Sequence, residues 1–124
     1  MLRFGSLLAL VVTLACVAPA RAEDPAGSPK EVRLTIVNLE YEGTKIWLPG
    51  TIVVPQGAKV TLNLINNTPS GQHGFAIPAF NVAVVVEKGV PQTVEFVADK
   101  EGIFPSFCQL HPAHVGGQLV VLDD

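Results

Sequence analysis

Residues 51–65 read TIVVPQGAKVTLNLI and carry the clearest indication of the fold class. Residues 51–54 are mostly β-branched, which is typical of a strand. Pro55 and Gly57 mark a turn, because proline presets one backbone angle and glycine tolerates the left-handed one. Apolar residues then recur at every second position along residues 60–65, which gives one apolar strand face. The stretch therefore predicts two strands joined by a tight turn.

Similar signals continue on both sides of this stretch. Six further short apolar or alternating segments are separated by turn residues, and they cover residues 31–37, 75–77, 82–86, 93–97, 103–107 and 118–122. No segment combines a sustained helical period with capping residues, so we expect little helix. Seven or eight short strands with regularly spaced turns predict an all-β Greek-key sandwich or barrel, and 124 residues suffice for one such domain.

Residues 1–22 have the layout of a secretory signal peptide. A basic start at Arg3 is followed by an apolar run over residues 7–18 and a small-x-small cleavage sequence at residues 20–22. The apolar run is about 12 residues long, whereas a membrane-spanning helix needs about 20. A lipid anchor on Cys16 is the other alternative, although the residues before it fit a lipobox poorly. We expect cleavage after residue 22, export across the inner membrane and a periplasmic location.

After cleavage, residues 23–30 form a flexible lead-in and residues 31–124 form the folded domain. The mature chain keeps six basic and eleven acidic residues, which gives a formal charge of −5 against −3 for the whole sequence. It has no basic run and no interleaved aromatic pattern, which argues against nucleic acid as a partner. Cys108 becomes the single cysteine, and an unpaired thiol in an oxidising compartment indicates metal binding, catalysis or intermolecular pairing.

The histidines favour metal binding. The chain has three of them, and His111 and His114 follow Cys108 in the spacing Cys-x2-His-x2-His, between two predicted strands. His73 lies on another predicted loop and supplies a distant fourth donor. A thiolate with imidazoles suits copper or zinc, but structural zinc sites usually consist of two short paired motifs, which are absent here. We therefore predict a copper site formed by His73, Cys108, His111 and His114.

A nucleophilic cysteine enzyme is the competing interpretation of Cys108. Such an enzyme needs a base within reach of the thiol and an orienting group, for which Asn66 or Asn67 is available. Three histidines are more than a catalytic dyad requires, and two of them share one tight loop with the cysteine. The donor set therefore favours the metal site over the enzyme.

At these residues the sequence resembles the cupredoxin family. Residues 51–60 are similar to the strand, glycine turn and strand that open the family's domain, and His73 stands where its first histidine ligand lies. The loop from Cys108 to His114 resembles the amicyanin-like ligand loop, with histidine in place of methionine. Residues 108–112, 74–82 and 96–102 are similar to nitrosocyanin-like copper proteins, in which glutamate replaces the first histidine.

The resemblance implies one copper ion per chain and electron transfer to a redox partner protein. It implies that Cys108 is the dominant donor, that His73 and His111 complete a near-trigonal set, and that His114 is the fourth ligand. Imidazole is a stronger donor than methionine, so we expect His114 to lower the potential and to shift the site from blue towards green or red. An apolar docking patch is expected near Pro78, Phe80 and Pro112, with Ala79 and Ala113 beside them.

Two alternative functions stay open at this stage. An open copper position, as in nitrosocyanin-like sites, would bind or convert a small molecule such as nitric oxide. A periplasmic copper carrier would hand its ion to a partner, although the methionine-rich tracts of some carriers are absent, since Met1 is the one methionine. We expect an electron carrier more than a catalyst.

Overall fold

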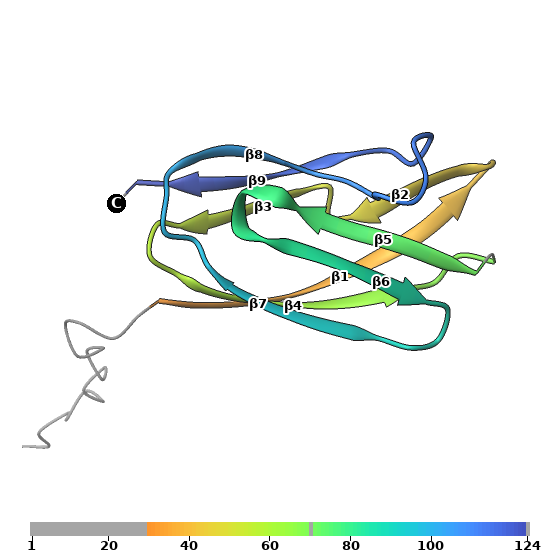
Figure 1. The fold of residues 1–124 in the computed structure, drawn as a ribbon, viewed down its shortest axis with the longest axis horizontal. Helices are drawn as coiled ribbons and strands as arrows, with labels where there is room; N and C mark the ends of the chain where they lie inside the picture. The colour runs from red at the N-terminus through yellow and green to blue at the C-terminus, as the bar shows by residue number, and fades with distance from the viewer. Residues whose placement is uncertain (1–29, 70, 124) are drawn as a thin grey trace, which may run out of the picture.

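The computed structural model describes residues 30–69 and 71–123, so the predicted signal peptide (residues 1–22) and most of the predicted lead-in lie outside the described part (Figure 1). Within the described residues the chain forms nine strands and one short 3-10 helix, η1. Their bounds are β1 (Glu31–Tyr41), β2 (Thr44–Leu48), β3 (Thr51–Pro55), β4 (Lys59–Asn66), β5 (Gln72–Ile77), η1 (Pro78–Phe80), β6 (Val82–Glu87), β7 (Gln92–Val97), β8 (Gly102–Ser106) and β9 (Gly117–Leu122).

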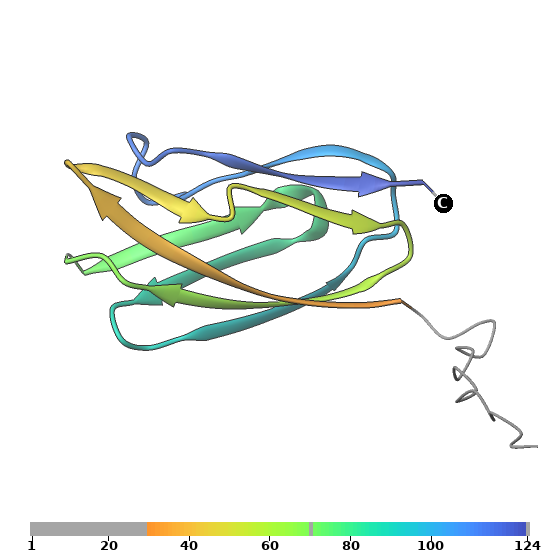
Figure 2. The same ribbon diagram turned by 180° about the vertical axis from the view of Figure 1, so that it is seen from behind.

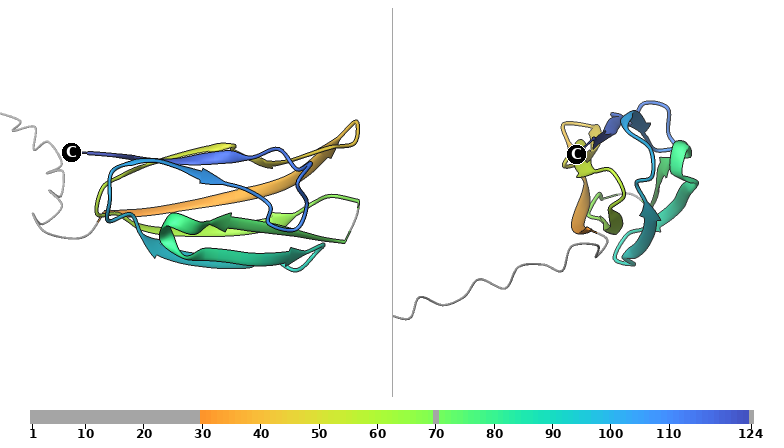
Figure 3. Two further views of the ribbon diagram at one scale, coloured as in Figure 1. Left: turned by 45° about the horizontal axis from the view of Figure 1, so that its top comes forward. Right: turned by 90° about the vertical axis from the view of Figure 1, so that its left-hand side faces the viewer.

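The strands pair into three sheets that together enclose one core. One sheet has the order β2-β1-β4-β7, a second has the order β3-β9-β8, and β5 pairs with β6. Strands β1 and β4 are parallel, as are β3 and β9, whereas the remaining pairs are antiparallel. The parallel pairs require crossover connections, which give the predicted Greek-key arrangement. Figures 1 and 2 show the two sides of the molecule. The end-on view in Figure 3 shows the strands surrounding a common centre.

The core consists of the inward-facing residues that the alternation predicts. Along β4, Val60, Leu62 and Leu64 are fully buried, and the residues between them are more exposed. Strands β3, β7 and β9 show the same alternation. Strand β5 is buried from His73 to Ile77 without alternation, because both of its faces are covered. The all-β fold with little helix is therefore confirmed.

Two predicted boundaries were wrong near the site. Strand β1 continues past residue 37 to Tyr41, because β2 pairs with this extension through Asn38 and Trp47. Strand β5 begins at Gln72, so His73 lies in a strand and not on the predicted loop. The reason is that β5 pairs with β6 and places His73 opposite Val86. The last residues of the glycine-rich segment therefore belong to a hairpin.

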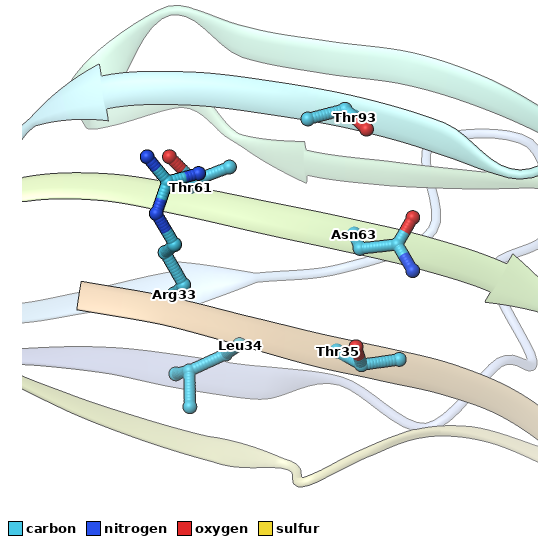
Figure 4. A pocket seen from close by; sticks show the side chains of 6 residues that line it. All are labelled: Arg33, Leu34, Thr35, Thr61, Asn63 and Thr93. Carbon is cyan, nitrogen blue, oxygen red and sulfur yellow. The ribbon is translucent and has the colours of Figure 1, made fainter.

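No helix within the described residues is long and apolar enough to cross a membrane. A shallow depression of about 340 Å³ lies on the outer face of β1, β4 and β7 (Figure 4). Five of its six lining residues are polar, and the lining consists of Arg33, Leu34, Thr35, Thr61, Asn63 and Thr93. None of the predicted metal donors lines it, so this hollow is a solvated sheet face and not the predicted metal site.

Candidate metal centre

His73 is the donor that comes from the sheet. It lies in β5 and is buried, with 1% of its surface exposed. Its ring centroid lies 4.8 Å from that of His111 and 5.4 Å from that of His114, although 38 residues or more separate it from them in sequence. The three histidines of the sequence therefore meet at one end of the molecule.

Cys108 reaches the same place through an isolated bridge that extends β8 toward β5. Phe107 and Ala76 exchange two backbone hydrogen bonds of 2.9 and 3.0 Å, which bring the segment after β8 alongside β5. The sulfur of Cys108 then lies close to Gly74, whose backbone N–H donates to Sγ at 3.2 Å. The side chain is 5% exposed. The buried sulfur therefore has one backbone N–H donor within hydrogen-bond distance.

His111 completes a cluster of three donors. Its Nδ1 lies 3.5 Å from the Cys108 sulfur, and the ring is exposed. Within the described residues, ligand atoms of His73, Cys108 and His111 all lie within 4.8 Å of one another. One metal ion at the centre of this set can reach all three, so these residues are positioned to bind a metal.

His114 lies beside this cluster but does not belong to it. It is buried, its Nδ1 lies 3.1 Å from the carbonyl oxygen of Val115, and its Nε2 lies 3.0 Å from Oδ1 of Asn38. Burial lowers the pKa of His114 below the usual histidine value. The carbonyl oxygen of Val115 acts in the opposite direction, while the charges of His111 and Lys45 lower the pKa further. Ligation by His114 stays a prediction.

Several residues outside the donor set hold the site in place. Trp47 donates its indole N–H to the carbonyl oxygen of Gly74 at 2.9 Å. Gln109 donates from its side-chain amide to the carbonyl oxygen of Val84 at 3.0 Å, and its side chain lies so close to Gly74 that a Cβ there would collide with it. The N–H of Val115 donates to the carbonyl oxygen of Lys45 at 2.8 Å. Strands β2, β5 and β6 therefore all restrain the donors.

Asn38 and Trp47 are the site residues that the sequence interpretation missed. The alternation of β1, extended past Ile36, places Asn38 on the inward face, where a polar residue is unusual. Trp47 is the one tryptophan of the sequence. The inward position of Asn38 and the single tryptophan can both be read from the sequence. Neither observation shows by itself what the side chain contacts.

We expect Trp47→Phe to lower the free energy of unfolding of the metal-free protein by about 1–3 kcal/mol, because a buried hydrogen bond and part of a buried ring are lost. Denaturant unfolding followed by circular dichroism measures this, since the variant lacks tryptophan fluorescence. Tyr41→Phe is the matched control, because Tyr41 is 75% exposed and its replacement should change stability by less than about 0.5 kcal/mol. Equal losses in both variants would contradict the role of Trp47.

The residues expected for docking come from two separate segments of the chain. His73 is near the start of β5, whereas Pro78 and Phe80 follow its end, at the far end of the β5–β6 hairpin (Figure 1). Phe80 packs on Phe96 and Phe104, with ring centroids 5.3 and 5.0 Å apart. Docking near Pro78, Phe80 and Pro112 stays a prediction, with Pro78 and Phe80 at the turn of hairpin β5–β6 and Pro112 in the ligand loop.

A family model described as a cupredoxin-like domain matches residues 6–121 of the chain. The chain therefore belongs to the cupredoxin family, whose members generally interact with redox partners and are typically periplasmic or secreted. This agrees with the sheet arrangement and with the donors described above.

The curated relatives are much longer proteins. The nitrous-oxide reductase of Cupriavidus necator is 44% identical over 55 residues, which are 43% of this chain and 9% of that protein. The nitrous-oxide reductase of Ralstonia nicotianae is 38% identical over 55 residues, again 43% of this chain and 8% of that protein. The chain thus matches less than a tenth of the length of either relative.

Two solved structures share the fold at low sequence identity. A copper nitrite reductase from Nitrosomonas europaea is 20% identical with a TM-score of 0.61, over 77% of this chain and 42% of that chain. Reduced auracyanin from Roseiflexus castenholzii is 18% identical with a TM-score of 0.61, over 75% of this chain and 98% of that chain. The second match therefore extends over almost the whole of that chain.

The donor set fits copper. One thiolate and two imidazoles at a buried β-sandwich site are the ligands that cupredoxins use for a single copper ion. Within the described residues the cluster holds no carboxylate and no second thiolate, which would favour harder ions or structural zinc. One copper ion per chain therefore agrees with both the family and the donor chemistry.

Proposed function

We propose that this protein is an exported electron carrier with one copper ion bound by His73, Cys108 and His111, and with His114 as a fourth ligand. The observation that carries the proposal is the cluster of three donors within 4.8 Å, of which two are buried and one reaches the surface. Bound copper supplies one-electron chemistry by alternating between its +1 and +2 states. Rigid β-strands hold His73 and the segment before Cys108, which supports fast transfer with little rearrangement.

His111 is the proposed route between the site and a partner. It is exposed, and its neighbours in the ligand loop are exposed apolar residues: Leu110, Pro112, Ala113 and Val115. Together with His111 these four residues form what we call the loop collar. An apolar surface around an exposed ligand permits close and transient contact, in which water is displaced readily. The negative mature chain favours a partner with a basic surface.

The direct test is an absorption and EPR spectrum of the copper-loaded mature chain. We expect an intense thiolate-to-copper absorption and the EPR signal of one copper per chain. Reversible loss and recovery of this absorption on reduction and oxidation would support electron transfer. Absence of a thiolate-to-copper band at full copper loading would contradict the proposal. Export is tested by a separate experiment. We expect the protein purified from the periplasm to begin at Glu23.

We expect Leu110→Glu to slow electron self-exchange between copies of the protein about tenfold, because it introduces like charges into the loop collar. The absorption spectrum should not change, since Leu110 is 42% exposed and is not a proposed donor. Self-exchange is measured by NMR line broadening in mixtures of the oxidised and reduced forms. Val53→Glu in β3 is the matched control, since Val53 is also exposed but lies outside the ligand loop. Equal rates in the two variants would exclude the loop collar as the contact surface.

One observation favours a second candidate function. His114 lies outside the three-donor cluster, which leaves a position at which a small molecule such as nitric oxide would bind. Titration of the copper-loaded protein with azide or nitric oxide distinguishes the two functions. A changed EPR spectrum at stoichiometric ligand supports the open site, whereas an unchanged spectrum supports electron transfer.

A further inference from the structure

Asn38 is a buried polar side chain next to the metal centre. It belongs to β1, none of its surface is exposed, and its Oδ1 lies 3.0 Å from Nε2 of His114. Its amide nitrogen, Nδ2, has no hydrogen-bond partner among the described residues. A buried amide N–H without a hydrogen-bond partner lowers the stability of the fold. Its position beside the metal ligands therefore indicates a specific role.

Asn38 engages the nitrogen of His114 that metal would need. The carbonyl oxygen of Val115 is an acceptor only, so the Nδ1 that contacts it carries the ring proton. In the neutral ring, Nε2 then has the free lone pair. A half-turn of the Asn38 carboxamide presents its unused N–H to that lone pair, since the oxygen and nitrogen of an amide have nearly the same shape. In this orientation Asn38 and copper compete for Nε2.

The other contacts of His114 restrain its backbone and its ring plane, so Asn38 decides the position of the ring. Trp47 lies against His114 with ring centroids 6.3 Å apart and an angle of 28° between the planes, which restricts tilting of the ring. The backbone N–H of His114 donates to the carbonyl oxygen of His111 at 3.0 Å, and the neighbouring Val115 is held by Lys45. With the backbone and the ring plane both restrained, the contact with Asn38 is the remaining interaction at Nε2.

We infer that Asn38 is a positioning residue that restrains His114 and so weakens the fourth bond to copper. The inference rests on the proposed copper site and adds the group that sets the strength of its fourth ligand. A weak fourth ligand gives a bluer site with a higher potential, and a strong one gives a greener site with a lower potential. Loss of a hydrogen bond of ordinary strength shifts the equilibrium toward copper-bound His114 about fivefold.

The test compares four copper-loaded proteins: the parent, Asn38→Leu, His114→Leu and the double variant. Leucine is close to asparagine in size and leaves no unused polar atom. We expect Asn38→Leu to raise the ratio of the shorter- to the longer-wavelength thiolate-to-copper absorption about twofold and to lower the midpoint potential. In the His114→Leu background the same substitution should change neither quantity, because Asn38 acts through His114.

Two outcomes would overturn the inference: an unchanged absorption ratio in Asn38→Leu, or an equal change in both backgrounds. If Asn38→Leu does not fold, nitrogen NMR of the unsubstituted chain decides the question. The ring nitrogens of His114 should shift less on loading with copper(I) than those of His73 and His111. Shifts of equal size in all three rings would contradict restraint by Asn38. Failure of the proposed function is distinguishable, since the parent would then have no thiolate-to-copper absorption at all.

Discussion

Cys108→Ser is expected to abolish the thiolate-to-copper absorption and to lower copper affinity by more than about 100-fold. Sulfur is the soft donor of the site, and a serine hydroxyl does not replace a thiolate as a ligand for copper. The N–H of Gly74, which now donates to Sγ, would face a smaller and uncharged oxygen. Competition with a chelator of known affinity measures the loss for copper(I), and an absorption spectrum measures the loss of the band.

The matched control for this prediction is Ser106→Ala. Ser106 is also buried and lies two residues before Cys108, at the end of β8, but it belongs to no donor cluster among the described residues. We expect this variant to keep the absorption and to bind copper within about threefold of the parent. Circular dichroism should show that both variants retain the β-sandwich. A Cys108→Ser protein that keeps the parent's absorption would contradict the assignment of the dominant donor.

Gly117→Val is expected to lower the free energy of unfolding by about 3 kcal/mol, a large part of the stability of a small domain. A Cβ at Gly117 would collide with the carbonyl oxygen of Gly50 and would lie 3.0 Å from Oγ of Ser106. That carbonyl oxygen accepts the N–H of Gln118 at 2.8 Å, so neither backbone segment can move without breaking a bond between them. Thermal and denaturant unfolding of the metal-free protein measure the loss.

Gly50→Ala is the control for the Gly117 variant, because it adds a methyl group on the other side of the same contact. A Cβ at Gly50 would approach only the carbonyl oxygen of Trp47, at an ordinary 3.8 Å. We expect a change below about 1 kcal/mol. Gly117 begins β9 directly after the ligand loop, so we also expect weaker copper binding in Gly117→Val. Equal stability of Gly117→Val and the parent would mean that this contact relaxes freely.

The strands were predictable where burial follows local periodicity. In residues 60–65 the alternation of side chains along a strand determines which residues face the core, and this geometry is a property of the chain itself. Strand β2 was missed because its pattern is irregular, and it forms because Asn38 and Trp47 are paired across a hairpin. His73 was placed on a loop for a related reason, since its strand exists only through pairing with β6.

The sequence by itself determined the fold class and the chemistry of the donors. Period-two burial is local, and a thiolate and imidazoles six residues apart or less in one loop have few other uses. Only the tertiary structure decided that His73 meets that loop and that Asn38 contacts His114. These proximities depend on strand register and on the bridge between Ala76 and Phe107, which are long-range pairings that no local pattern encodes.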